Sequence, residues 1–203
     1  MTPEDVETFE RCISVGGVAI FPADTVYGLA TEPDSREGVE RLYRLKGRVP
    51  DKPSAVMFFK LGSALAALPE LGDRTRSAVE RLLPDALTLV LPNPARRYQL
   101  ACGPEPERVG LRVPRLEGAL APLAAVGWPV LQSSANRSGG PDARRVEDID
   151  ARVREGADLV LDAGELPGTP STVVDLSSYE DTGEWSVIRE GAIPREAMVR
   201  SLR

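Results

Sequence analysis

The stretch GGVAIFPADTVYG, residues 16–28, gives the first indication of the fold. Its run from Val18 to Phe21 is rich in β-branched and aromatic side chains, and it is bounded by two glycines on one side and by Pro22 on the other. A short apolar run between such residues is typical of a buried strand. We therefore predict a strand over 18–21 that leads into a loop over 22–28.

Helices are predicted on both sides of this strand. Thr2 carries a helix-start signal, and apolar residues follow it at helical spacing up to the glycines. Ser35 can cap a second helix that ends at 46–48. Pro50 and Pro53 then indicate a loop. The strand at 18–21 therefore lies between two predicted helices.

The rest of the chain continues this alternation. Further strands are predicted at 55–59, 87–91, 109–113, 130–132, 159–161, 172–176 and 186–188. Helices are predicted between several of them, at 73–83 with Asp73 as cap, 116–125, 146–154 and 194–202. This pattern predicts an α/β fold with one twisted sheet of mixed strand order flanked by helices. The length of 203 residues, without repeat or linker, predicts a single domain over 1–203.

The composition limits the classes of partner. The chain is 42% hydrophobic and 28% charged, as in ordinary globular proteins. Its net charge of -6 argues against non-specific binding of nucleic acid or anionic membranes. The acidic N-terminus does not resemble a signal peptide, and the most apolar window, 119–131, contains two prolines and a glycine. We expect a cytoplasmic protein without a membrane role.

The absence of histidine excludes many catalytic and metal sites. No Ser-His-Asp or Cys-His system and no histidine metal site can be built. Cys12 and Cys102 stand alone, outside any zinc or redox spacing, and are expected to be buried reduced thiols. We therefore expect no metal held by protein ligands alone.

A local excess of positive charge lies in residues 36–52, which carry six basic and three acidic side chains. The first three arginines fit a solvated helix face. Lys46 and Arg48 flank a glycine at the predicted helix end, where an ammonium and a forked guanidinium could hold a polyphosphate together. A plain surface turn is the alternative.

A second candidate is the loop QSSANRSGG at 132–140, which follows a predicted strand. Ligands commonly bind at strand ends in α/β sheets, although serine, asparagine and glycine also form ordinary turns. Neither a P-loop nor a GxGxxG fingerprint occurs, so any nucleotide site is of another kind. The acids near loops, at positions 24, 85, 142 and 175, are interpreted as caps and turn formers, and none is nominated as a general base.

Seven blocks, taken together, resemble the YrdC-like family of L-threonylcarbamoyladenylate synthases. The family patterns PTxTVYGL, KxR, PGPxTLxL, RxP, TSANxSG, STVVD and RxGAI resemble, in order, residues 22–29, 46–48, 84–91, 112–114, 133–139, 171–175 and 189–193. The resemblance implies a YrdC-like twisted sheet with a concave, positively lined cavity, in the short, single-domain form of the family.

The resemblance also implies a reaction. It would form threonylcarbamoyl-AMP and pyrophosphate from L-threonine, bicarbonate and ATP with Mg²⁺, for N6-threonylcarbamoyladenosine at position 37 of tRNA. Such a reaction needs no enzyme nucleophile, so a chain without histidine can catalyse it by positioning and charge neutralisation. The product would pass to the tRNA threonylcarbamoyl transferase machinery, and no tight tRNA binding is expected of this chain alone.

Site residues follow from the same blocks as expectations. Those implied for ATP are Lys46, Arg48, Lys52, Thr88, Ser134, Asn136 and Arg189, with Lys46 and Arg48 as the catalytic pair. Those implied for L-threonine are Thr25, Met57, Arg112 and Ser171. For Arg112, a structural ion pair is the alternative.

Three positions depart from the family pattern. Ala23 stands where many members have threonine, Met57 where many have histidine, and Asp85-Ala86 where the family has Gly-Pro. Met57 could simply pack as a flexible apolar side chain. Asp85 could repel phosphates or help to hold Mg²⁺. The alternatives are therefore a non-catalytic nucleotide- or RNA-binding paralogue, and adenylation of a different carbamoyl acceptor.

Overall fold

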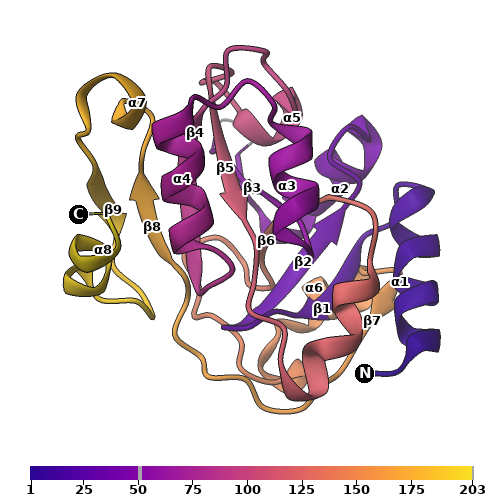
Figure 1. Cartoon of the computed structure of the whole chain (residues 1–203). Helices are drawn as coiled ribbons and strands as arrows, with labels where there is room; N and C mark the ends of the chain where they lie inside the picture. Colours follow the sequence, from indigo (N-terminus) through magenta and orange to yellow (C-terminus); the bar gives the residue numbers. More distant parts are fainter. Residues whose placement is uncertain (50–51, 203) are drawn as a thin grey trace.

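A nine-stranded mixed sheet runs through the described part of the chain, residues 1–49 and 52–202 of a computed structural model. The strand order is β7-β1-β2-β6-β3-β5-β4-β8-β9. Helices flank the sheet, with α3 and α4 in front of it and α1 at one end (Figure 1). The predicted α/β architecture, a twisted sheet of mixed order with flanking helices, is confirmed.

The first two strands form a hairpin that the sequence pattern did not reveal. Strand β1 spans Ala19–Pro22 and pairs antiparallel with β2, Tyr27–Thr31. The predicted loop over 22–28 is therefore wrong at its end, because Tyr27 and Gly28 already belong to β2. Every residue of β2 is buried, so the strand lacks the alternation of a half-exposed strand.

The other seven strands confirm the prediction, with small shifts at their ends. They are β3 Ala55–Met57, β4 Leu87–Pro92, β5 Arg108–Arg112, β6 Val130–Ser134, β7 Leu159–Val160, β8 Thr172–Asp175 and β9 Ser186–Arg189. Strand β3 pairs parallel with β5 and antiparallel with β6, whereas β4 pairs antiparallel with β5 and parallel with β8. The sheet is therefore mixed at its centre.

The two N-terminal helices begin where their capping residues predict. Helix α1, Pro3–Ser14, starts with a capping box at Thr2, and α2, Arg36–Lys46, is capped by Ser35. Gly47 ends α2 with a φ of 58°, a left-handed conformation that glycine adopts without strain. Pro53 lies in an irregular segment, and Pro50 lies outside the described residues.

Other helices differ from the prediction in detail. Helix α4, Asp73–Leu82, is preceded by Gly72 as its N-cap, so Asp73 is the first helical residue and not the cap. Residues Gly118–Ala125 form a 3-10 helix with Pro122 inside, which lacks the N–H that an α-helix would use. The predicted helix over 146–154 is divided into a 3-10 turn, Val146–Asp148, and α6, Ala151–Gly156.

The remaining helices lie in the middle and the C-terminal part of the chain. Helix α8, Arg195–Ser201, was predicted. Three short helices were not: α3 Leu61–Ala67, α5 Gln99–Cys102 and α7 Tyr179–Thr182. None of these three has a side-chain cap, and α5 and α7, of four residues each, are too short to show a helical period.

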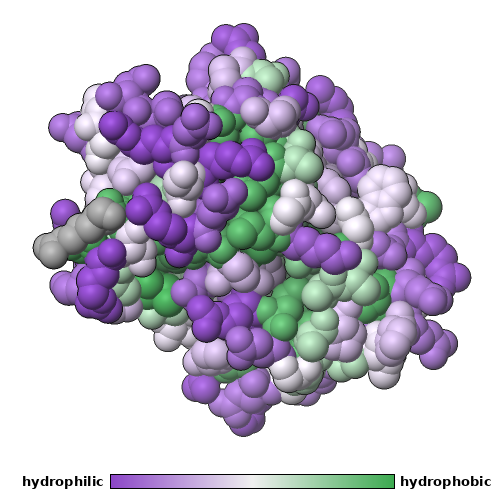
Figure 2. All heavy atoms as spheres, viewed as in Figure 1, coloured by the Kyte–Doolittle hydropathy of each residue, from purple (hydrophilic) through white to green (hydrophobic). Residues whose placement is uncertain are grey.

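Two apolar clusters lie on opposite faces of the sheet. The smaller cluster packs α1 and the 3-10 helix Gly118–Ala125 against strand residues that include Phe21, Met57 and Val130. The larger cluster fills the other face. Most side chains on the face of Figure 2 are hydrophilic, with an apolar band between α3 and α4. No helix in the described ranges has the length and apolar character needed to cross a membrane.

Candidate functional site

A cavity of about 390 Å³ lies on one face of the sheet, the same face on which the smaller apolar cluster with α1 packs. Its floor includes Gln132, Ala55, Gly110 and Val90, which are neighbours in register across β6, β3, β5 and β4. Gly110 has no side chain and Ala55 only a methyl group, so the middle of the floor stays open. Strand β5 also directs Arg108 and Arg112 to the same face, because alternate residues of a strand share a face.

At one end of the cavity, Arg112 forms a buried cluster with Asp24 and Thr25. The guanidinium Nη2 donates to Asp24 Oδ1 at 2.5 Å and to Thr25 Oγ1 at 2.6 Å. Arg112 is only 3% exposed, and its Nε is buried without a partner. The structure thus brings the predicted Thr25 and Arg112 together. It also contains the structural ion pair that was the alternative for Arg112.

Beside this cluster lie three further predicted residues, Thr88, Ser171 and Arg189. The hydroxyls of Thr88 and Ser171 are 2.9 Å apart, and Arg189 Nη2 donates to the Ser171 carbonyl at 2.7 Å. All three line the cavity. Burial lowers the pKa of Arg189, the charge of Arg112 lowers it further, and Asp142 opposes the change.

Lys46 lies behind the cavity wall and holds the loop that follows β6. Its Nζ donates to the Asn136 carbonyl at 2.8 Å, to Asn136 Oδ1 at 3.0 Å and to the Ser134 carbonyl. These bonds use all three ammonium protons, and the side chain is buried. Burial, assisted by the charge of Arg48 and opposed by Asp142, lowers the pKa of Lys46 to about 8. Lys46 therefore fixes the Ser134–Asn136 loop in this state.

Arg48 reaches the cavity wall from the segment after α2. Its Nη1 donates to Ser133 Oγ at 3.0 Å, and its Nη2 donates to the carbonyls of Lys52 and Pro53. Burial lowers the pKa of Arg48, against the effect of Tyr43. Lys52 is exposed and contributes its backbone carbonyl to Arg48, while its side chain does not line the cavity.

The charges around the cavity are unevenly compensated. Four arginines line it against two carboxylates, so the lining is positive, as expected. Arg112 is paired with Asp24, and Arg108 with two carboxylates. Within the described ranges, Arg48 and Arg189 have no carboxylate within ion-pair distance. The cavity therefore presents two partly desolvated, uncompensated guanidinium groups.

The three departures from the family pattern do not reach the cavity wall. Met57 is completely buried in the smaller apolar cluster, which also contains Ala23. Met57 shares its sheet face with Ala55 but lies two residues further along β3, beside Arg112 of β5, where it packs in the smaller apolar cluster. The structure therefore does not place Met57 in a substrate pocket. Asp85 pairs with Arg115 at 3.2 Å and also lies outside the lining.

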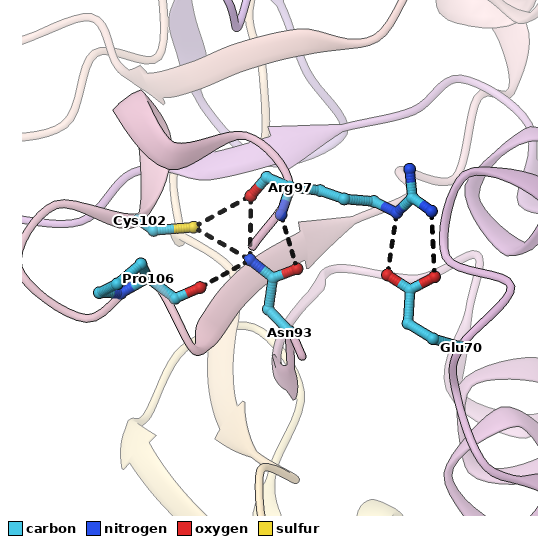
Figure 3. Close-up of polar contacts among 5 residues, drawn as sticks. All are labelled: Glu70, Asn93, Arg97, Cys102 and Pro106. Atoms are coloured by element: carbon cyan, nitrogen blue, oxygen red, sulfur yellow. Dashed lines mark hydrogen bonds and ion pairs between the residues drawn. The ribbon is translucent and has the colours of Figure 1, made fainter. Parts of the chain in front are cut away.

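One wall of the cavity was not anticipated: the segment 93–107 brings Cys102 and Glu105 to it. Asn93 is fully buried, and its Nδ2 donates to the carbonyls of Arg97 and Pro106 at 2.9 Å each (Figure 3). Its Oδ1 accepts from Arg97 N at 3.0 Å. No sequence signal predicts this loop, because its bonds join residues of irregular backbone. Cys102 is buried as expected, whereas Cys12 is half-buried.

Tyr27 anchors the linker that leads from β7 to Ser171. Its hydroxyl lies 2.8 Å from both Asp162 Oδ1 and the Gly164 carbonyl, and it accepts from Ala163 N at 3.0 Å. Burial is the main cause that raises the pKa of Tyr27 to about 12. The Tyr27 carbonyl also accepts from Ala135 N. One residue of β2 thus holds both loops that carry site residues.

Comparisons with known proteins give the family of the chain. A model of the Sua5/YciO/YrdC family, described as "Telomere recombination", matches residues 11–191. The chain belongs to the Sua5/YciO/YrdC family.

Within this family, the chain is similar to curated threonylcarbamoyl-AMP synthases. The protein of Stenotrophomonas maltophilia is 31% identical over 82% of this chain and 90% of the relative. That of Pyrococcus abyssi is 28% identical over 91% of this chain and 53% of the relative. A crystal structure of P. abyssi Sua5 complexed with L-threonine superposes with a TM-score of 0.83 and 26% identity, covering 99% of this chain and 58% of that chain. The chain thus spans about half the length of the P. abyssi relative.

Proposed function

We propose that this chain forms L-threonylcarbamoyl-AMP and pyrophosphate from L-threonine, bicarbonate and ATP. The observation that carries the proposal is the single cavity that joins two uncompensated arginines, Arg48 and Arg189, to the buried cluster around Arg112. The names of the relatives from S. maltophilia and P. abyssi support the same reaction. The product would serve N6-threonylcarbamoyladenosine formation at position 37 of tRNA.

The uncompensated arginines form the proposed phosphate end. A desolvated guanidinium without a counter-ion gains most from an anion, and it can hold two phosphate oxygens at once. Arg48 and Arg189 meet this description, and the loop at Ser134–Asn136 supplies polar groups beside them. Lys46 would act here by holding that loop or by turning an Nζ proton toward phosphate. This end therefore suits the triphosphate of ATP.

The cluster around Arg112 forms the proposed amino-acid end. The Thr25 hydroxyl accepts from its guanidinium. Thr88, which the family blocks implied for ATP, is the register neighbour of Arg112, and its hydroxyl lies 2.9 Å from that of Ser171. Such a set suits a small polar amino acid with a carboxylate and a hydroxyl. The similar P. abyssi Sua5 structure is a complex with L-threonine, which supports the choice of threonine. Met57, the register neighbour of Arg112, packs in the smaller apolar cluster and does not line the cavity.

The proposed chemistry requires no covalent enzyme intermediate. The threonine amine attacks the carbon of bicarbonate, and the carbamate forms with loss of water. A carbamate oxygen then attacks the α-phosphorus of ATP, the bond to the β-phosphate oxygen breaks, and pyrophosphate leaves. The protein contributes by aligning the reactants and by neutralising the phosphate charge. These are the tasks that arginines and fixed dipoles perform without histidine.

Mg²⁺ is proposed to enter with ATP. Over the described residues, no three His, Cys, Asp or Glu side chains gather as a metal site. Mg²⁺ on a nucleotide needs only one or two carboxylates, because phosphate and water oxygens complete its shell. Among the described residues, Asp142 is the cavity-wall carboxylate without an ion pair, and it fits that requirement. When bound, the ion would help to neutralise the phosphate charge.

Transfer to tRNA is proposed to occur elsewhere. The chain carries a net charge of -6, which disfavours tight binding of tRNA by its surface. The threonylcarbamoyl group would therefore be handed over to the tRNA threonylcarbamoyl transferase machinery.

The test is pyrophosphate release from ATP, Mg²⁺ and bicarbonate with each of the twenty amino acids, with the adenylate checked by mass. Threonine-dependent release is expected, and Lys46→Ala and Arg48→Ala should each abolish it. Arg36→Ala, on the exposed face of α2, is the matched control and should remain active. Release with another amino acid would mean a different acceptor. ATP binding without release in any mixture would indicate a non-catalytic nucleotide-binding protein.

A further inference from the structure

Asp142 is one of two carboxylates on the cavity wall, and it differs from the other in its charge partners. It lies on the cavity wall, after the loop that Lys46 holds. Asn136 Nδ2 donates to its Oδ1 over a long distance of 3.4 Å. The other acid on the wall, Glu105, is paired with Arg108 at 2.9 Å. Among the residues that the structure describes, Asp142 is thus the one cavity-lining carboxylate without an ion pair.

The neighbours of Asp142 place it at the phosphate end. It touches Asn136, and its charge raises the pKa values of Lys46 and Arg189 against the larger effect of burial. Lys46 Nζ donates to the loop carbonyls and to Asn136 Oδ1, Arg189 Nη2 donates to the Ser171 carbonyl, and neither cation forms an ion pair with Asp142 among the described residues. Asp142 therefore lies at the proposed phosphate end, and its negative charge is not neutralised by an ion pair with the cations there.

A carboxylate beside a polyphosphate is unfavourable unless a cation lies between them, because like charges repel strongly in a partly desolvated site. A divalent cation removes this conflict. Mg²⁺ is characteristically bound by one or two carboxylates together with phosphate oxygens and water. We propose that Asp142 anchors the Mg²⁺ that accompanies ATP, and so fixes where the triphosphate lies relative to Arg48 and Arg189. This inference rests on the proposed function and adds a metal-anchoring residue to it.

The test is ATP binding by calorimetry, with and without Mg²⁺, in the wild type and in Asp142→Asn. Amino acid is omitted so that no turnover occurs. Asparagine has the same shape and keeps an oxygen for the Asn136 bond, so the fold should be retained. With Mg²⁺, Asp142→Asn should bind ATP about tenfold more weakly, the lower end of the ~10–100-fold that residues supporting a metal contribute. Without Mg²⁺ it should bind ATP more tightly than the wild type, since a repulsive charge is gone.

Glu105→Gln is the matched control, because it neutralises the other wall carboxylate, which already has a partner. In this control, ATP binding should not become weaker with Mg²⁺ and tighter without it. A second readout is Mn²⁺ in place of Mg²⁺, followed by electron paramagnetic resonance, in which Asp142→Asn should hold less Mn²⁺ in the presence of ATP. Asp142→Ala, checked by thermal melting, gives the same comparison with a smaller side chain.

The outcomes separate the inference from the proposed function. Equal loss of ATP binding with and without Mg²⁺ would overturn the inference and indicate a role in holding the loop. Unchanged ATP binding in Asp142→Asn, both with and without Mg²⁺, would also overturn it. Failure of the wild type to bind ATP at all would contradict the proposed function itself.

Discussion

Asp24 and Arg112 form an ion pair that is almost completely buried. Their side chains are 6% and 4% exposed, and Asp24 Oδ1 lies 2.5 Å from Arg112 Nη2. The other oxygen, Oδ2, accepts from the backbone N–H of Arg115 at 3.0 Å. Asp24→Asn removes the negative charge and leaves the shape. Because an arginine does not give up its proton in a protein, the Arg112 charge would stay buried and uncompensated.

The size of the effect follows from this burial. Removing one partner of a buried pair typically costs ~3–5 kcal/mol of unfolding free energy. The cavity beside Arg112 admits water, so we expect the lower end, about 3 kcal/mol. For a chain of this size, each kcal/mol lowers the melting temperature by ~2–4 °C, so Asp24→Asn should melt about 6–12 °C lower.

The assay is urea unfolding together with calorimetric melting, with Glu107→Gln as the matched control. Glu107 pairs with Arg96 at 2.6 Å, nearly the same distance, but their side chains are 59% and 58% exposed. An exposed pair contributes ~0–1 kcal/mol, so this variant should melt almost as the wild type does. Equal losses in the two variants would refute the reasoning that burial, and not distance, decides the contribution.

Three further outcomes are expected. Because the pKa of Lys46 is lowered, the unfolded chain keeps this proton to higher pH than the folded chain does. The unfolding free energy, measured by urea titration, should therefore rise from pH 8 to 10 by on the order of 1–3 kcal/mol relative to Lys46→Met. Tyr27→Phe should speed hydrogen exchange at 162–164 and cost ~1–3 kcal/mol, because the anchoring hydroxyl is lost. Asn93→Ala should cost ~2–4 kcal/mol and expose Arg97 to trypsin, since the Asn93 side chain bonds the backbone N–H and carbonyl of Arg97.

Local signals in the sequence determined the helix ends and most strands. Thr2, Ser35 and Gly47 act within a few residues of themselves, so their caps and the left-handed helix end could be predicted without knowing the partners. The short apolar runs identified eight of the nine strands for the same reason. The blocks around Lys46 and Ser134 also indicated the site, since polar residues at helix and strand ends face ligands in α/β folds.

Three features became clear only from the tertiary structure. They are the existence of strand β2, the pairing of the charges in the cavity, and the location of the residues that depart from the family pattern. Gly28 is typical of a turn, yet it lies in β2, where a side chain would meet Gln132 of β6 at 2.9 Å. Met57 was expected at the substrate, but it packs in the smaller apolar cluster and does not line the cavity. Arg112 is paired with Asp24, which lies far from it in the sequence, whereas Asp142 has no ion-pair partner among the described residues. Such pairings arise from packing in three dimensions, which local pattern cannot encode.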